Sequence, residues 1–347
     1  MSKNKVAVIT GLLGQDGSHL AELLMSKGYE VIGIRKRTNF YDQDRVNELL
    51  SFAKMHNAKL EIIDGDITDG GVFLEILKKY NPTEVYNLAA MSFVHDSFAM
   101  PELTFTTDAV GCLKMLELIR SSGAKDDIRF YQASTSEMFG SSPPPQNEET
   151  IFHPRSPYGV AKLCAYWITV NYREAYNMFS TNGILFNHEG PRRGEQFVTR
   201  KISMSVAKIQ KKLLDKISLG NLDSLRDWGY AADYVEGMWK ILQHDRPDDF
   251  VLATGESHSV REFVEASFEY IGIQIRWEGS GKDEKGYCSK SNKLLVDINP
   301  EFYRPSEVDD LRGDPSKAKS ILGWEPKTSF KELVNMMVES DLKLLSE

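Results

Sequence analysis

The sequence has few cysteines and no long apolar run, and each absence excludes a class of protein. Three cysteines occur in 347 residues, at Cys112, Cys164 and Cys288. They lie far apart and form no Cys-x-x-Cys pair, so we expect neither a disulfide framework nor a zinc cluster, and we predict no metal site. No apolar stretch reaches the roughly 18 residues of a membrane span, and the first apolar run, residues 6–9, is too short for a signal peptide. These features predict a soluble cytoplasmic protein.

Positive charge is also scarce. The 42 lysines and arginines are outnumbered by 50 aspartates and glutamates, which gives a formal net charge of −8. A general attraction to nucleic acid or to an anionic membrane is therefore not expected. Any anionic ligand must be held by a few local basic side chains.

Short apolar runs rich in β-branched residues alternate with helix-like segments along the first half of the chain. Expected strands cover residues 5–10, 29–35, 60–64, 84–90, 128–134 and 182–187, and expected helices include 18–27, 104–121 and 158–176. This alternation predicts an α/β fold with a doubly wound parallel sheet of Rossmann type, covered by helices on both faces. In such a sheet the ligand crevice lies at the carboxyl ends of the strands.

The pattern becomes irregular after about residue 187. Residues 199–212 are expected to be helical, and residues 233–242 and 250–254 could return to the main sheet. Helices at 260–271 and 330–345 suggest a smaller C-terminal lobe. Residues 141–154, which include three consecutive prolines, are expected to form an exposed loop.

A glycine-rich segment, Thr-Gly-Leu-Leu-Gly-Gln-Asp-Gly, follows the first expected strand and precedes the first expected helix. Glycines let the backbone approach a pyrophosphate, and a helix N-terminus offers free N–H groups and a positive dipole. The context predicts a dinucleotide-binding turn, and the alternative is a tight turn without a ligand. The residues assigned to the cofactor here are Gly11, Leu12, Leu13, Gly14, Gln15, Asp16 and Gly17.

Basic residues end the second expected strand, where a plain NAD enzyme would place an acidic residue. Arg35 and Arg37 flank Lys36, and guanidinium groups bind phosphate through paired hydrogen bonds. We therefore predict NADP over NAD; the alternative is a solvated basic strand end. Further cofactor contacts are expected after the third and fourth strands, at Asp66, Ile67, Leu88, Ala89, Ala90 and Ser92.

Tyr158 and Lys162 form a Tyr-x-x-x-Lys pair at the start of an expected helix. Positions four apart share a helix face, so the ammonium can lie near the phenol or near the cofactor ribose. A nearby positive charge favours the phenolate, which is the form that a general base needs. The pair arises often by chance, so its meaning depends on the rest of the sequence.

The segment Ala-Ser-Thr-Ser-Glu-Met-Phe-Gly, residues 133–140, supplies that context. It places hydroxyls and a carboxylate at the end of the fifth expected strand. With the glycine turn, Ala89-Ala90 and the Tyr158–Lys162 pair, the chain resembles the extended short-chain dehydrogenase/reductases in the order and approximate spacing of its motifs. Sugar-nucleotide 4,6-dehydratases of this family carry an acidic residue after a hydroxyl pair, and Thr135-Ser136-Glu137 is similar to the GDP-mannose version.

The resemblance implies a chemistry for these residues. Tyr158 would remove the proton of the sugar 4-hydroxyl while hydride leaves C4 for NADP. The 4-ketone acidifies the C5 hydrogen, which Glu137 would take while the 6-hydroxyl leaves as water, and the hydride returns to C6. Thr135 and Ser136 would orient the 4-oxygen. The cofactor ends unchanged, so it should stay tightly bound.

The resemblance to the GDP-mannose 4,6-dehydratases spans nearly the whole chain, and residues 182–202 are especially characteristic. It implies cofactor contacts at His188 and Arg193. It also implies contacts with GDP-mannose or a related GDP-sugar, at Asn187, Val198, Lys201, Arg226, Arg304 and Glu307. The domain division expected from these roles is an NADP-binding domain of residues 1–187, to which 228–255 returns, and a nucleotide-sugar lobe of 188–227 and 256–347.

The chain departs from the family pattern at Phe93, Leu103 and Gly190 and in residues 38–45. Relatives use a loop in the latter region for tetramer contacts, and the resemblance implies a homodimer or a homotetramer. Three alternatives stay open: a dehydratase of another GDP-sugar such as a GDP-manno-heptose, an epimerase or reductase of the same superfamily, and a non-catalytic NADP-binding sensor. Glu137 argues against the epimerase or reductase.

Overall fold

The protein is described by a computed structural model that covers residues 5–36, 43–303, 308 and 310–346. Its main sheet has seven strands in the order β11-β6-β5-β4-β1-β2-β3, and all neighbouring pairs are parallel. The strands are β1 (Val6–Thr10), β2 (Glu30–Arg35), β3 (Leu60–Asp64), β4 (Glu84–Asn87), β5 (Arg129–Thr135), β6 (Ser180–Leu185) and β11 (Phe250–Leu252). The predicted doubly wound parallel sheet is confirmed.

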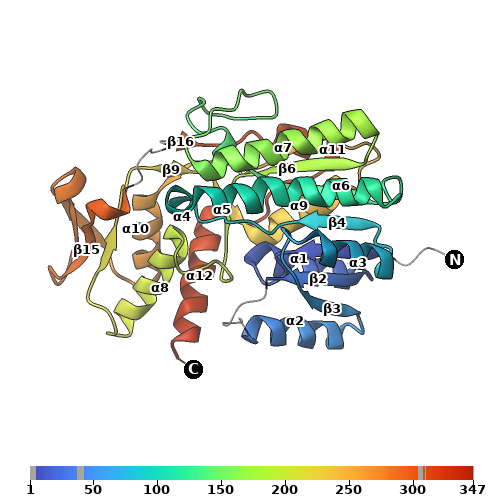
Figure 1. Ribbon diagram of the computed structural model, residues 1–347. Coiled ribbons are helices and arrows are strands. Elements are labelled where there is room, and N and C mark those ends of the chain that lie inside the picture. The colour runs from blue at the N-terminus through green and yellow to red at the C-terminus, as the bar shows by residue number, and fades with distance from the viewer. Residues whose placement is uncertain (1–4, 37–42, 304–307, 309, 347) are drawn as a thin grey trace.

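Helices cover both faces of this sheet (Figure 1). They are α1 (Gln15–Ser26), α2 (Gln43–Met55), α3 (Gly70–Tyr80), α4 (Val94–Ala99), α5 (Pro101–Phe105), α6 (Gly111–Ser121), α7 (Pro157–Tyr176), α9 (Ala231–Gln243) and α11 (Ser316–Leu322). Successive strand residues point to opposite faces, so Ile9 packs with α1 and α9 whereas Val8 packs with α3, α6 and α7. Both faces are apolar, which explains the continuous apolar strands of the sequence.

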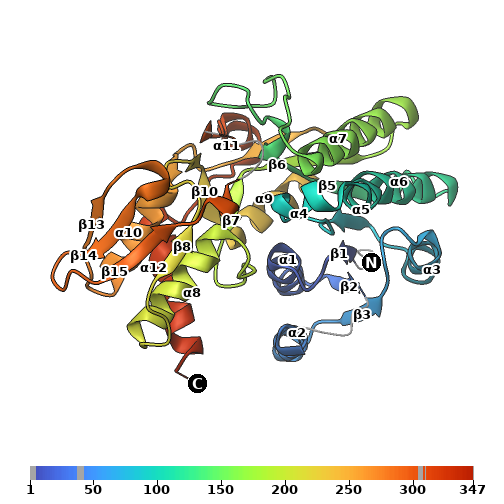
Figure 2. The same ribbon diagram turned by 60° about the vertical axis from the view of Figure 1, so that its left-hand side comes forward.

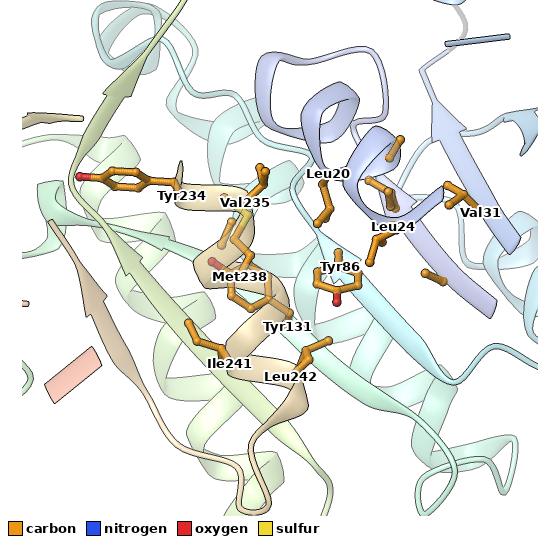
Figure 3. Close-up of a cluster of buried hydrophobic side chains, with 14 of the residues drawn as sticks. Leu20, Leu24, Val31, Tyr86, Tyr131, Tyr234, Val235, Met238, Ile241 and Leu242 are labelled. Atoms are coloured by element: carbon orange, nitrogen blue, oxygen red, sulfur yellow. The ribbon is translucent and has the colours of Figure 1, made fainter. Parts of the chain in front are cut away.

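The core on the α1 and α9 side joins segments that are far apart in the sequence. Leu20 and Leu24 of α1 meet Val235 and Met238 of α9 above the sheet residue Tyr86 (Figure 3). The segment that contains α9 and β11 therefore returns to the main sheet after the chain has left it. This return places the start of the C-terminal lobe beside the carboxyl ends of the strands.

The C-terminal lobe lies beside the main sheet and has a small sheet of its own (Figure 2). Its strands are β13 (Ile275–Glu278), β14 (Lys285–Cys288), β15 (Leu294–Ile298) and β8 (Ile217–Leu219), and its helices are α8 (Val198–Gln210), α10 (Val260–Tyr270) and α12 (Phe330–Leu344). Short strands join the lobe to the main sheet: β7 (Asn187–Glu189), β9 (Leu225–Arg226), β10 (Trp228–Tyr230), β12 (His258–Ser259) and β16 (Asp310–Leu311). The sequence analysis predicted the three helices but no small sheet.

Several boundaries differ from the expected ones. Strand β4 ends at Asn87, so Leu88 to Ala90 lie in a loop, and the strand expected at 182–187 is split into β6 and β7. The expected helix 104–121 is interrupted by a π-helical turn, Thr106–Val110, between α5 and α6. The loop of residues 141–154 is not wholly exposed as expected, because Gln146 is fully buried. Its backbone bonds to Arg312 and Asp314 tie the loop to the end of the chain.

No helix in the described part of the chain is long and apolar enough to span a membrane.

Candidate active site

A cleft of about 900 Å³ lies at the carboxyl ends of the strands, between the main sheet and the C-terminal lobe. Gly11 and Gly14 line it after β1, and Thr135 lines it after β5. From the other side Arg226 and Phe302 line it. The cleft therefore joins the predicted cofactor turn, the predicted catalytic segment and the C-terminal lobe in one space.

The glycine turn needs its glycines for two close approaches. Gly11 has a φ of +69°, and a Cβ there would lie 3.0 Å from the backbone nitrogen of Ala89. A Cβ at Gly17 would lie 2.2 Å from the carbonyl oxygen of Gly11, so the turn packs directly on the first turn of α1. Leu13, Gln15 and the following Asp16 also line the cleft. A negatively charged group can approach the free N–H groups of this helix end.

Not every residue assigned to the cofactor faces the cleft. Leu12 is fully buried under Gly33, and Ile67 packs in the core. The Arg35 guanidinium bonds to Asp64 at 2.7 Å, and Asp66 pairs with Lys36 at 3.3 Å. Of the remaining assigned positions, Leu88, Ala90 and Ser92 line the cleft, Ala89 does not, and Arg37 lies outside the described residues.

Arg45 is a cleft residue that the sequence analysis missed. It lies on α2, and its Nη1 donates to the Ser18 hydroxyl at 3.1 Å, which holds the guanidinium over the N-terminal part of α1. Its sequence signal is weak, a basic residue eight positions after Arg37. Spacing along the chain does not reveal that α2 folds back over the glycine turn.

Helix α7 places the predicted catalytic pair. The Ser156 hydroxyl accepts from the Gly159 N–H at 3.0 Å and caps the helix, and Pro157 follows at its first position. Tyr158 and Lys162 both face inward and are almost fully buried. The Lys162 ammonium donates to the Ala133 carbonyl oxygen at 2.9 Å and lies 5.9 Å from the centre of the Tyr158 ring.

The charge states of this pair differ from the simple expectation. Burial raises the pKa of Tyr158 far above its ordinary value, and the charges of Asp108 and Glu137 raise it further, against a hydrogen bond with Thr135. Burial lowers the pKa of Lys162. In the protein alone, burial thus outweighs the effect of the lysine, and the phenol keeps its proton.

Thr135, Ser136 and Glu137 form the turn between β5 and the loop that follows it. The Thr135 hydroxyl accepts from the Glu137 N–H at 3.2 Å, which fixes the turn. All three residues line the cleft, and only 6% of Glu137 is exposed. The structure therefore brings the hydroxyl, the carboxylate and the Tyr158 phenol together at one point of the sheet edge.

Asp108 is a second residue that the sequence analysis missed. It sits in the π-helical turn and is 1% exposed, and its Oδ1 accepts from the Met91 N–H at 2.8 Å. Within the described residues, Oδ2 has no hydrogen-bond donor. Burial raises the pKa of Asp108, while the charge of Lys162 lowers it. No motif marks Asp108 in the sequence, since the same helical segment also carries Lys114, Glu117 and Arg120. Its place in the π-helical turn is the stronger sign, because such turns are often found at functional sites.

A row of buried polar side chains connects the glycine turn to Lys162. Thr10, Asn87 and Gln132 stand opposite one another on β1, β4 and β5. The Thr10 hydroxyl donates to Asn87 at 2.8 Å, Asn87 donates to Gln132 at 2.7 Å, and Gln132 donates to the Ala133 carbonyl oxygen at 3.1 Å. That same oxygen accepts from Lys162. Buried amides are costly unless they are bonded, so a fully bonded row holds the sheet edge in one arrangement.

The residues that the resemblance assigned to the nucleotide sugar lie along the far part of the cleft. Asn187, Val198, Lys201 and Arg226 all line it, whereas Arg304 and Glu307 lie outside the described residues. The Lys201 ammonium stands 3.5 Å from the centre of the Phe302 ring, and burial lowers the pKa of Lys201. Arg226 Nη1 donates to the Val308 carbonyl oxygen at 2.8 Å. Basic groups are thus concentrated in the cleft of an acidic protein.

The three departures from the family pattern take different places. Phe93 lines the cleft and packs edge-on against Phe197, with the two ring centres 5.5 Å apart. The Arg193 guanidinium stacks on the Phe197 ring, 3.6 Å from its centre. A Cβ at Gly190 would lie 3.1 Å from the ring of Tyr230. Leu103 is 43% exposed on α5, outside the cleft. Phe93 therefore adds an apolar wall to the cleft, and Leu103 does not touch it.

The arrangement suits proton transfers on a polar organic ligand. As the phenolate, Tyr158 can take a hydroxyl proton. Glu137 can take or give a second one, and Thr135 can hold an oxygen between them. Among the described residues, no group of three or more His, Cys, Asp or Glu side chains could hold a metal ion.

Comparison with known protein sequences gives full-length matches. The sequence profile of a family described as GDP-mannose 4,6 dehydratase matches residues 8–337. The chain is 53% identical over 346 residues to a GDP-mannose 4,6 dehydratase of Drosophila melanogaster, covering 99% of this chain and 88% of that protein. It is 53% identical over 342 residues to the enzyme of that name from Homo sapiens, covering 98% and 92%.

Solved structures share the fold at lower sequence identity. A UDP-glucose 4-epimerase of Thermotoga maritima, solved with UDP-glucose, superposes with a TM-score of 0.81 at 24% identity, covering 98% of this chain and 99% of that one. RMD from Pseudomonas aeruginosa, complexed with NADPH, superposes with a TM-score of 0.75 at 19% identity, covering 98% of each chain. At these identities the likeness concerns the fold.

Proposed function

Since the chain belongs to the GDP-mannose 4,6-dehydratase family, we propose that it is a hydro-lyase that converts GDP-mannose to GDP-4-keto-6-deoxymannose. One observation of the site carries the proposal most directly. A nearly buried carboxylate, Glu137, shares the edge of the sheet with Thr135 and the Tyr158 phenol. Oxidation of a hydroxyl alone needs one base, whereas elimination of water needs a second group that exchanges protons.

The cofactor proposed for this reaction is NADP. The glycine turn suits a dinucleotide. The backbone of the turn packs too closely at Gly11 and Gly17 to leave room for a Cβ, and glycines at such a turn let the backbone approach a pyrophosphate. Arg35, Arg37 and Arg45 would hold the 2′-phosphate, and RMD of known structure is a neighbour with bound NADPH. A bound nicotinamide would supply the hydride exchange between C4 and C6 of the sugar, so the cycle would need no other oxidant.

The protein's own residues would carry the protons. In its phenolate form Tyr158 accepts the proton of the 4-hydroxyl, and Thr135 donates a hydrogen bond to the same oxygen with help from Ser136. Glu137 takes the C5 proton and passes it to the 6-hydroxyl, which leaves as water. A proton returns to C5, and the one that Tyr158 accepted balances it. Lys162 is bonded to the Ala133 carbonyl oxygen. In its protonated form it places a positive charge near the Tyr158 phenol, and this charge favours the phenolate.

Recognition of the substrate is assigned to the C-terminal side of the cleft. We propose that Arg226 binds the diphosphate, that Asn187, Val198 and Lys201 contact the nucleotide sugar, and that Arg304 and Glu307 face the ribose or the base. The corresponding division is a cofactor domain of residues 1–187 with 228–255, and a substrate lobe of 188–227 with 256–347. His188 and Arg193, at the junction, are assigned to the cofactor side.

We further propose that the chain forms a homodimer or a homotetramer. Helices α5, α6 and α7 lie side by side at the surface (Figure 1) and carry large exposed apolar side chains, at Leu103, Leu113, Val160 and Trp167. Val160 and Trp167 are seven positions apart, so they share one face of α7. A second copy would cover such a face. The free thiols of Cys112, Cys164 and Cys288 suit a reducing compartment, and a cytoplasmic location is proposed for that reason.

The test is to incubate the purified protein with GDP-mannose and a catalytic amount of NADP⁺ and to follow the sugar nucleotide by mass spectrometry. We expect the loss of one water without net build-up of NADPH, and NMR would place the ketone at C4. Water loss only from another GDP-sugar, such as a GDP-manno-heptose, would keep the mechanism and change the substrate. If the protein binds NADP firmly but reacts with no nucleotide sugar, the proposed enzymatic activity is wrong, and a non-catalytic NADP-binding sensor is favoured.

A further inference from the structure

His188 lies at the junction of the two lobes with both ring nitrogens engaged. It sits on β7, its ring stacks on Tyr234 of α9 at 4.7 Å, and only 9% of the residue is exposed. Nδ1 lies 2.7 Å from the Phe186 carbonyl oxygen, and Nε2 lies 2.8 Å from Oδ2 of Asp16. One ring nitrogen thus contacts the backbone of Phe186, and the other contacts Asp16 in the first turn of α1.

Both partners of the ring can only accept hydrogen bonds. A carbonyl oxygen has no proton, and the pKa of Asp16 is lowered to about 2 by His188 and Arg193 in spite of its burial, so its carboxylate has none near neutrality. A neutral imidazole has one N–H and would leave one of these two short contacts without a proton. A proton on each nitrogen satisfies both contacts at once, and a ring in that state is a buried imidazolium.

Asp16 occupies a position where an unpaired negative charge would be harmful. It is the second residue of α1, directly beyond the glycine turn, and it lines the same cleft as Gly11 and Gly14. A dinucleotide in that turn brings its pyrophosphate to the helix N-terminus. Two like charges at this place would repel each other unless a cation offsets one of them.

From these contacts we infer that the His188 imidazolium neutralises Asp16, and that this buried charge pair retains the cofactor by tying the glycine turn to the strand that enters the substrate lobe. The inference rests on the cofactor site proposed above and deepens it. Because both nitrogens are engaged within the protein, His188 acts as a positioning residue through Asp16 and not through an N–H bond to the cofactor. Gln15 reinforces the link, since its amide donates both to the His188 carbonyl oxygen at 3.0 Å and to Asp16 at 3.2 Å.

The inference predicts a pH dependence with a definite sign. The charge of Asp16 and the bonds of the ring raise the pKa of His188 above its ordinary value of 6.5, against burial and the charge of Arg193. The other ionisable groups that contact or act on this ring are Tyr234 on α9 and His19 on α1. Since the folded pKa is raised, the pair is complete below pH 6.5 and is lost as the pH rises through the raised value. Cofactor release should then become faster, because Asp16 is left unpaired.

The charge state can be measured without cofactor or substrate. Imidazole ¹⁵N shifts of the uniformly labelled free protein, with His188 assigned by the loss of its signals in His188→Gln, should show two protonated nitrogens at pH 6.5. The other six histidines of the chain serve as internal references. A neutral single tautomer at this pH would overturn the inference whatever the catalytic activity of the protein.

A double-mutant cycle separates the charge from the packing. His188→Gln removes the ion-pair partner of the Asp16 carboxylate and should weaken NADP⁺ binding about tenfold, the effect of losing one charge-assisted bond. Asp16→Asn in the same chain removes the charge and should restore binding to within about threefold of the wild type. If each substitution only disturbed the packing, the two losses of NADP⁺ affinity would add. A double variant that binds NADP⁺ no more tightly than His188→Gln would therefore contradict the inference.

Asp16→Asn alone tests the pH dependence. Its amide can donate to a neutral His188, so the link survives without charge, and the affinity for NADP⁺ should follow the pH between 6 and 9 less steeply than in the wild type. Both proteins meet the same ligand, so the titration of the ligand itself cancels. Asp69→Asn is the matched control, because Asp69 also stands at a helix N-terminus but caps α3 outside the cleft. If wild type and Asp16→Asn show the same pH profile, the inference is wrong.

Discussion

Gly159 of α7 lies against the backbone of Glu137, and a Cβ at Gly159 would stand 2.7 Å from the Glu137 carbonyl oxygen. Ordinary contacts of a Cβ atom are longer than 3.4 Å. The helix that carries Tyr158 and Lys162 and the turn that carries Thr135 and Glu137 can therefore approach this closely only because position 159 has no side chain. The relative placement of the two proton-transfer groups depends on that contact.

Gly159→Ala should consequently reduce turnover more than it reduces stability. The added methyl meets backbone and not a flexible side chain, so α7 or the turn must shift, and a displacement of about 1 Å between reacting groups can lower kcat by roughly 100-fold. NADP⁺ affinity should fall less than kcat, because the glycine turn lies on β1 and α1 and not on α7. Gly71→Ala in α3, whose nearest neighbour is the Asp69 side chain at 3.2 Å, is the control. Unchanged kcat in Gly159→Ala would show that the close contact has no role in placing the groups.

Local spacing was sufficient to predict the parts of the site that are contiguous in sequence. The glycine turn lies between one strand and one helix, and Tyr158 and Lys162 lie on one helical turn, so neighbouring residues determine their geometry. The parallel arrangement of the sheet also followed from the apolar character of its strands, because a parallel sheet is buried on both faces.

Contacts between distant segments could not be predicted in the same way. Asp108 reaches Met91 through a π-turn that no periodicity signals, and Arg45 reaches Ser18 because α2 folds back over α1. The small sheet was missed because its strands are short, β13 having only four residues, and because β8 joins it from about eighty positions earlier in the chain. Residues 141–154 were expected to be exposed from their prolines, but Gln146 is buried by a partner more than 160 residues away.

The preference for NADP can be tested on Arg35. We expect tighter binding of NADP⁺ than of NAD⁺, and Arg35→Met should reduce that preference by roughly tenfold through the loss of a charged donor to phosphate. Lys36→Met is the control, since Lys36 is exposed and pairs with Asp66. Both affinities can be measured by titration of the free protein. Tighter binding of NAD⁺ by the wild type would remove the prediction.

The charge of Asp108 should influence how kcat depends on pH, through the pKa of the proposed base Tyr158. Its charge is the largest single charge effect that raises the pKa of Tyr158. Asp108→Asn keeps an acceptor for the Met91 N–H and removes the charge, so the pKa of Tyr158 should fall. The limb of kcat against pH that reports ionisation of the phenol should then move to lower pH. A profile that is lowered in height but not displaced would assign Asp108 a structural role alone.

Glu137→Gln should separate oxidation from elimination. The amide keeps nearly the same shape as the carboxylate but cannot take the C5 proton, so the 4-hydroxyl can still be oxidised while water is not lost. Mixing the variant with GDP-mannose and NADP⁺ should therefore produce a burst of absorbance at the NADPH wavelength, up to about one equivalent per site, and no loss of mass corresponding to water. The wild type should show no lasting absorbance, because its hydride returns to C6. Tyr158→Phe is the informative counterpart: it should show neither the burst nor the water loss, since the first proton transfer fails. Full dehydration by Glu137→Gln would mean that another group performs the elimination, and the assignment of Glu137 would then be wrong even if the overall reaction were right.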